Sequence, residues 1–120
     1  MIRILNDLPE NVLGVEVIGT VTDDDYEKVL VPAIQNMRSR DQGIRIVYVL
    51  GNDFDGWTTG AAWEDTKLGL SELRAWQKIA VVSDKDWLRH SVTAIGWMMP
   101  GEVRAFDLDD FGAAKEWAAK

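Results

Sequence analysis

The sequence predicts an α/β fold, with one mixed sheet of about five strands and about four helices packed on it. Two nearly continuous apolar runs, Ile44–Leu50 and Lys78–Val82, are typical of strands covered on both faces. Segments of helical periodicity alternate with such runs, which indicates parallel strands joined by crossovers. Two alternating segments open the chain, and they indicate an antiparallel pair, so the expected sheet is mixed.

The opening pair consists of Ile2–Leu5 and Val12–Ile18, separated by turn residues. Thr22–Asp25 then resembles a helix capping box with Asp in place of the usual Glu, and apolar residues recur at helical spacing after it. Pro32 lies inside this helix and has no N–H to donate. We therefore expect a kink or break near Val31.

The central strand, Ile44–Leu50, is expected to stop at Gly51 and to pass through a polar loop into a helix from about Gly60 to Trp76. Lys78–Val82 is the next inner strand. Ser83–Asp86 resembles a second capping box that opens a helix ending at Met99. A short strand, Val103–Phe106, precedes a last helix capped by Asp107 or Asp109. The predicted order is β-β-α-β-α-β-α-β-α, in one domain over residues 1–120.

Composition limits the classes of partner. The 120 residues contain 20 acidic and 13 basic side chains, for a net charge of −7, and the basic residues are scattered. This argues against nucleic acid and anionic membranes as main partners. There is no cysteine, no apolar run long enough to cross a membrane and no signal-peptide pattern. The expectation is a cytoplasmic protein.

The loop after the central strand and the helix start that follows it form the predicted functional site, because ligands in open α/β sheets gather beyond the carboxyl ends of strands. Phe54 lies two positions before Gly56 and Trp57 directly after it, so an aromatic residue stands on each side of this glycine. We expect Trp57 to be exposed as the anchor of the site. The candidate binding residues are Asp53, Phe54, Asp55, Trp57, Thr58, Thr59, Gly60 and Trp63.

Each candidate also has a structural interpretation. Thr58 and Thr59 are typical helix caps as well as candidate anion ligands. Asp53 and Asp55 suggest a metal site or an acid/base pair, but the sixth position of an EF-hand loop would be Thr58 instead of Gly, so a turn role is favoured and no metal is predicted. Trp63 and Trp87 lie at helical positions where a core role is favoured.

Two further features are weaker candidates. His90 is the only histidine, so a catalytic triad or a multi-histidine metal site has a single candidate, and a structural role is favoured. Trp97–Met99 precedes Pro100 as an apolar helix end that packs internally or meets a second copy of the chain. We favour the second interpretation, a homodimer surface.

Five segments carry a resemblance to a known family: Leu8–Gly14, Thr22–Pro32, Tyr48–Trp57, Trp63–Asp65 and Trp97–Val103. With the element order, they make the chain similar to the SpoIIAA-like subgroup of the STAS superfamily, the fold of anti-sigma-factor antagonists, which is also compared with Sec14-type lipid-binding folds.

The resemblance implies a phosphorylation site. Antagonists of this superfamily carry a phosphorylatable Ser in an Asp-Ser-Ser-Gly setting at the start of the helix after the central strand. The segment Trp57–Gly60 occupies that place here, so the resemblance assigns Thr58 as the phosphosite. This chain has Trp in place of the Asp and Thr in place of both serines.

The favoured function is therefore a noncatalytic binding or regulatory module that recognises a partner protein, or a small anionic or amphipathic ligand, at residues 53–62. The alternative is a Sec14-like carrier of a lipid or small apolar ligand. A small enzyme that uses Asp53, Asp55 or Glu64 as acid or base is less favoured, because no nucleophile, oriented base or cofactor fingerprint accompanies them. No catalytic residue and no cofactor are predicted.

Overall fold

A computed structural model describes residues 1–39, 43–60, 63, 67, 75–86 and 101–120. They contain a five-stranded sheet of order β1-β2-β3-β4-β5, in which β1 is antiparallel to β2 and all other neighbours are parallel. The mixed α/β sheet predicted from the sequence is confirmed. The strands are β1 (Ile2–Leu5), β2 (Leu13–Val21), β3 (Ile44–Trp57), β4 (Trp76–Ser83) and β5 (Glu102–Phe106).

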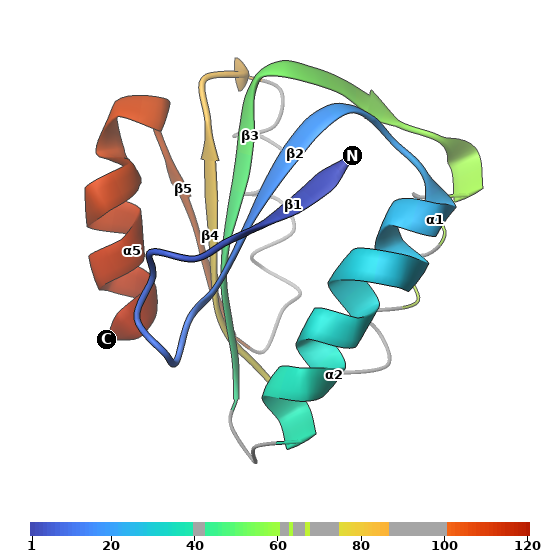
Figure 1. Cartoon of the computed structure of the whole chain (residues 1–120). Helices are drawn as coiled ribbons and strands as arrows, with labels where there is room; N and C mark the ends of the chain where they lie inside the picture. The colour runs from blue at the N-terminus through green and yellow to red at the C-terminus, as the bar shows by residue number, and fades with distance from the viewer. Residues whose placement is uncertain (40–42, 61–62, 64–66, 68–74, 87–100) are drawn as a thin grey trace.

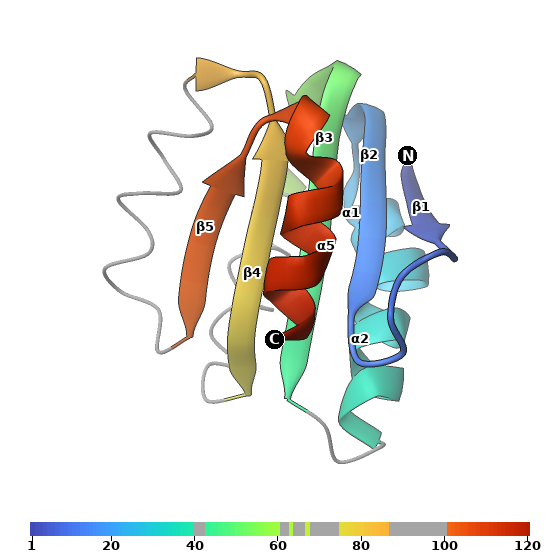
Figure 2. The same ribbon diagram turned by 90° about the vertical axis from the view of Figure 1, so that its left-hand side faces the viewer.

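Helices cover both faces of the sheet (Figures 1 and 2). On one face runs a helical segment made of α1 (Asp23–Asp25), the π-helix η1 (Tyr26–Leu30) and α2 (Val31–Ser39). On the other lies α5 (Phe111–Ala119), preceded by the short 3-10 helix η2 (Leu108–Asp110). Two other helices were predicted, one from about Gly60 to Trp76 and one that follows Ser83–Asp86 and ends at Met99, and most of their residues lie outside the described ranges. Thr59, Gly60, Trp63 and Lys67 are helical. Trp76, predicted as a helix end, instead begins β4.

The helix after β2 begins at the predicted capping box. The Thr22 backbone N–H donates to Oδ2 of Asp25 at 2.8 Å, and the Asp25 N–H donates to Oγ1 of Thr22 at 3.3 Å. Asp25 thus performs the role that Glu or Gln usually has in this motif. Its carboxylate also lies 3.3 Å from the Met1 ammonium group.

Pro32 accounts for the π-helical turn that follows. In a regular α-helix the ring of Pro32 would crowd the carbonyl of Lys28, which would also lack a donor. The structure instead has one wider turn, in which the Val31 N–H donates to the carbonyl of Tyr26, five residues back. The predicted irregularity near Val31 is confirmed, and it is a widened turn, not a break.

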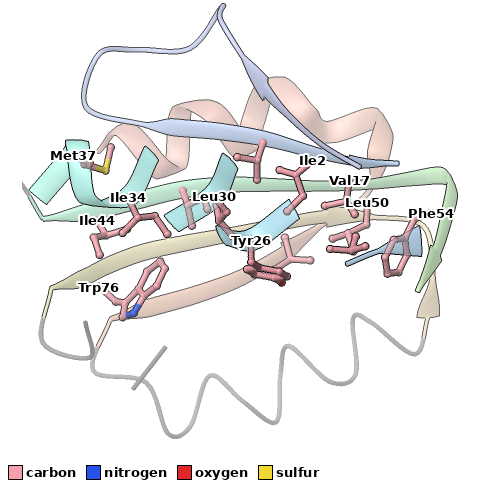
Figure 3. Packing of buried hydrophobic residues seen from close by; sticks show 14 residues of the cluster. Ile2, Val17, Tyr26, Leu30, Ile34, Met37, Ile44, Leu50, Phe54 and Trp76 are labelled. Atoms are coloured by element: carbon pink, nitrogen blue, oxygen red, sulfur yellow. The ribbon is translucent and has the colours of Figure 1, made fainter. Parts of the chain in front are cut away.

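The sheet separates two apolar clusters. The larger one lies under the helical segment, which contributes Tyr26, Leu30, Ile34 and Met37 at a spacing that places them on one face (Figure 3). The smaller one lies under α5, where Ala114 and Ala118 allow the helix close to the sheet. Ile46 of β3 belongs to the first cluster and Val47 to the second, so this strand is covered on both faces, as its apolar run predicted.

Side chains from β3, from β4 and from the turn before β2 hold the C-terminal end of α5. Asn11 donates to the carbonyl of Ala119 at 3.1 Å, Arg45 to that of Ala118 at 2.8 Å and Lys78 to that of Trp117 at 2.9 Å. Two of these donors are cations at the negative end of the helix dipole.

Of the two caps predicted for the last helix, Asp107 is the N-cap residue of η2, which leads directly into α5, and Asp109 lies within η2. Neither Asp107 nor Asp110, the residue before α5, makes a side-chain cap hydrogen bond. Asp84, at the end of β4, accepts from the Leu108 N–H at 3.1 Å instead. A donor at this helix start is thus satisfied by a residue far away in sequence, which local sequence rules do not anticipate.

Candidate functional site

The segment predicted as a loop, Asn52–Trp57, is the second half of β3. Up to Leu50 the strand pairs with β2 and β4, whereas β4 ends at Ser83, opposite Leu50. Beyond that point β2 is the one strand among the described residues that pairs with β3, which bends over the end of the sheet toward α1 (Figure 1). The functional candidates therefore lie on the outer end of a strand, not on an independent loop.

Two irregularities in the ladder allow this extension. The register shifts between Val17 and Gly19, and again between Gly19 and Thr20. Gly19 has a φ of 66° and Gly56, paired with Thr20, has a φ of 130°, conformations that side-chain-bearing residues rarely adopt. The same glycine that marked a turn in the sequence permits a bulged strand in the structure, and this explains the wrong loop prediction.

Trp57 is not the exposed anchor that was predicted, and Phe54, the other aromatic candidate of this segment, is buried. Phe54 is 2% exposed and belongs to the large apolar cluster, where it lies at the end opposite Trp76 (Figure 3). Trp57 is half-buried against that cluster, and its ring meets the ring of Phe54 edge-on, with centroids 4.7 Å apart. These contacts attach the outer end of β3 to the large apolar cluster.

The polar candidate residues are less buried than Phe54. Asp53, Asp55 and Thr59 are exposed, whereas Thr58 and Gly60 are half-buried. The Thr58 N–H donates to the carbonyl of Val21 at 2.8 Å, which holds the ends of β3 and β2 together. As a result, the start of α1 and the helical residues that begin at Thr59 lie side by side.

Asp23 lies against the second of these helix starts. A Cβ atom placed on Gly60 would be 3.1 Å from Cγ of Asp23, so only a glycine gives this carboxylate its full room. Asp23 is exposed and on the first turn of α1. A negative charge beside Gly60 weakens the attraction that the helix start would offer to an anionic ligand.

Among the residues that the structure describes, Trp63, three positions after Gly60, is the exposed aromatic residue. Its exposed fraction is 62%, so the favoured core role is wrong for this residue. The sequence signal that misled us was helical spacing, which cannot tell which face of a helix is covered. Other candidates lie outside the described residues: Glu64, Asp65, Trp87, His90 and Trp97–Met99.

Asp25, at this end of the molecule, has a perturbed pKa. Burial disfavours its charged form, but hydrogen bonds from the Thr22 backbone, the Met1 ammonium group and the Thr22 hydroxyl outweigh that cost. The pKa of Asp25 therefore lies below its ordinary value of 3.8. The carboxylate acts as a helix cap, not as a proton donor at neutral pH.

Two searches of the described residues bear on metals and membranes. Within the described ranges, no three His, Asp or Glu side chains are grouped so that they could hold a metal ion. No helix in the part of the chain that the structure describes is long and apolar enough to cross a membrane.

Comparison with known proteins identifies the family. The SpoIIAA-like family model matches residues 12–119. The crystal structure of a Shewanella loihica protein, described as an uncharacterized DUF3478-family protein with a SpoIIAA-like fold, is similar with a TM-score of 0.76 and 26% identity, over 98% of this chain and 93% of that one. A search of curated proteins found no match. The chain therefore belongs to the SpoIIAA-like family, in agreement with the resemblance in its sequence.

Proposed function

We propose that this protein is a noncatalytic binding or regulatory module that recognises a partner protein at its recognition edge, defined as residues 53–60 together with Trp63. Membership of the SpoIIAA-like family supports a binding or regulatory module in general. The edge and the kind of partner are our assignment.

One observation carries the assignment: exposed residues at the outer end of β3 are attached to a buried anchor. Asp53 and Asp55 are exposed, whereas Phe54 between them is buried in the core. Alternate residues of a strand point to opposite faces, so burial of one fixes the direction of its neighbours. A rigid strand end holds binding groups more closely in place than a free loop does.

Trp63 supplies apolar contact area next to these polar groups. Tryptophan is enriched among the residues that contribute most to protein–protein binding, because it buries a large surface with few rotatable bonds. At 62% exposure, its indole is available to a partner without prior rearrangement.

A partner protein is favoured over a small ligand. Phe54 is already packed in the core, so it does not line an open ligand site, and the Asp23 carboxylate beside Gly60 disfavours a small anion. Neither the apolar-carrier alternative nor the carboxylate enzyme gains support from an observation on the described residues.

Regulation through Thr58 remains a part of the proposal. Thr58 is half-buried and its backbone N–H is held by Val21, so a phosphate there would act on the junction between β2 and β3. Native mass spectrometry of the protein purified from its own host would read out phosphate, and would also report a second copy of the chain.

Photo-crosslinking in the host tests the proposal. A photoreactive amino acid placed at Thr59 should give one adduct of discrete mass, because Thr59 is exposed within the edge. The control position is Asp109, which is exposed just before α5. Absence of an adduct from Thr59, or the same adduct from both positions, would overturn the proposed edge.

A further inference from the structure

We propose that β1 is the interface of a symmetric dimer, in which the outer edge of β1 pairs antiparallel with β1 of a second copy of the chain. The two five-stranded sheets then form one continuous sheet. This surface is separate from the recognition edge, so the inference goes beyond the proposed function.

The hydrogen bonds between β1 and β2 show which way the backbone groups of β1 point. The Met1 nitrogen donates to the carbonyl of Ile18 at 2.8 Å, and the Ile18 N–H donates to the carbonyl of Met1 at 2.8 Å. Residue pairs that exchange both bonds recur at every second position of an antiparallel ladder. The pairing of β1 with β2 runs without a register shift, so this alternation holds along the whole strand.

The consequence is a row of backbone groups on the outer side of β1. Arg3 and Leu5 follow Met1 at intervals of two, so their N–H and C=O groups point toward β2. The N–H and C=O groups of Ile2 and Ile4 point away from β2. β1 lies at the rim of the sheet, and no strand in the described ranges pairs with its outer side (Figure 2). Such groups are a template for another strand.

The side chains of β1 give this edge little protection. Edge strands are commonly protected by charged residues, and at the other rim β5 has two of them exposed, Glu102 and Arg104. In β1 the one charged residue is Arg3, which pairs with Glu16 of β2. Ile4 is 37% exposed, one of three large apolar residues that are exposed in the described part of the chain. Pairing with another strand covers it.

A second copy of this chain fits the edge because the edge is self-complementary. Antiparallel pairing needs outward backbone groups at alternate positions of both strands, and β1 has them at Ile2 and Ile4. A copy turned by half a revolution presents the same groups in the opposite direction, which is the contact of a two-fold symmetric dimer. It also offers an apolar side chain to the exposed Ile4.

The charge of Arg3 selects the register. Within the four residues of β1, two registers bring outward groups opposite outward groups over at least three residues. One places Arg3 opposite Arg3 of the second copy, and like charges at directly opposite positions are destabilising. The other places Ile4 opposite Ile4, and Arg3 opposite Leu5 of the second copy. Ile4 therefore lies on the two-fold axis, where its side chain packs against its own copy.

The short length of β1 makes the dimer weak. A four-residue strand forms few backbone hydrogen bonds with its copy and buries less surface than the interfaces of stable complexes do. We expect a dissociation constant on the order of 100 µM, and hence a monomer in dilute solution.

Sedimentation equilibrium between about 10 µM and about 1 mM tests the association. The average mass should rise from that of one chain toward that of two. Amide hydrogen exchange, measured by NMR at both ends of this range, locates the contact. Protection of the Ile4 N–H should rise with concentration, whereas the N–H groups of Arg3 and Leu5, which already point toward β2, should change little.

Matched variants separate the edge from overall charge. Ile4→Lys brings two like charges together on the axis and should raise the dissociation constant by about tenfold or more. Ala113→Lys changes the net charge equally at an exposed position of α5, so it should change that constant by less than about twofold. Circular dichroism checks that both fold. Ile4→Thr keeps a β-branched side chain and serves if Ile4→Lys does not fold, and it should raise the constant by about threefold.

The outcomes are distinct. A chain that stays monomeric at about 1 mM, or equal effects of Ile4→Lys and Ala113→Lys, would overturn the inference. A dimer that forms without added protection of the Ile4 N–H uses another surface and would overturn it too. Crosslinking from Thr59 to a partner should persist in Ile4→Lys, so the proposed function stands or fails independently of the dimer.

Discussion

The two halves of β3 differ in how many neighbours each has. Ile44–Leu50 lies between β2 and β4 and contributes to both apolar clusters, whereas in the described part of the chain Gly51–Trp57 pairs only with β2. The second half has exposed Asp residues on either side of the buried Phe54. Once β4 ends, β3 changes from an interior strand to one that has a strand neighbour on one side only among the described residues, while Phe54 still attaches it to the core.

Phe54→Ala is the change with the largest expected effect on this comparison. Phe54 is 2% exposed, so its truncation should lower the free energy of unfolding by about 3 to 5 kcal/mol. Asp55→Ala, at the exposed neighbouring position, should change it by less than about 0.5 kcal/mol. Denaturant titration of both variants measures the difference.

The comparison fails if Phe54→Ala costs no more than Asp55→Ala. The segment would then behave as the independent loop that the sequence indicated, and the recognition edge would lose its rigid attachment.

Gly56→Ala tests the bulge that lets β3 continue. The φ of 130° at Gly56 is unfavourable for a residue with a Cβ, so we expect a loss of about 1 to 3 kcal/mol in unfolding free energy. Gly51→Ala is the matched control, since a Cβ at Gly51 meets no atom within 4 Å and its φ is not in the positive region. It should be neutral or slightly stabilising. Equal effects at both glycines would show that the positive φ at Gly56 does not require a glycine at this position.

Asp25→Asn gives the smallest expected effect and reports on the cap beside the edge. The folded-state pKa of Asp25 is lowered, so its charge stabilises the fold above the ordinary value of 3.8, and this contribution disappears as the pH falls through the folded pKa. Above about pH 5, Asp25→Asn should be less stable than the unchanged protein by about 0.5 to 1 kcal/mol.

Thermal unfolding as a function of pH measures this difference. It should shrink steadily below about pH 4. A difference that persists unchanged into acid would mean that the amide costs stability through packing and not through lost charge.

Much of the fold was predictable because it depends on local patterns. The apolar run from Ile44 predicted a strand covered on both faces, Thr22 and Asp25 formed the predicted cap, and Pro32 caused the predicted irregularity. In each case, the periodicity or the chemistry of a few adjacent residues is sufficient to favour one backbone conformation.

The candidate site was only partly predictable. Its location at the carboxyl end of the central strand came from sequence, but the exposed tryptophan proved to be Trp63 instead of Trp57. Helical spacing places Trp63 on a face without saying what covers that face, and a glycine next to Trp57 permits a bulge as well as a turn.

The sequence by itself determined the mixed α/β fold and its strand directions. The tertiary structure decided which aromatic rings are buried, how far β3 extends and that Asp23 lies against Gly60. The physical reason is that burial and strand pairing depend on which distant segments come together. Val21 and Thr58 are 37 positions apart in the chain, yet the pairing of β2 with β3 and a hydrogen bond from Thr58 to Val21 bring them together.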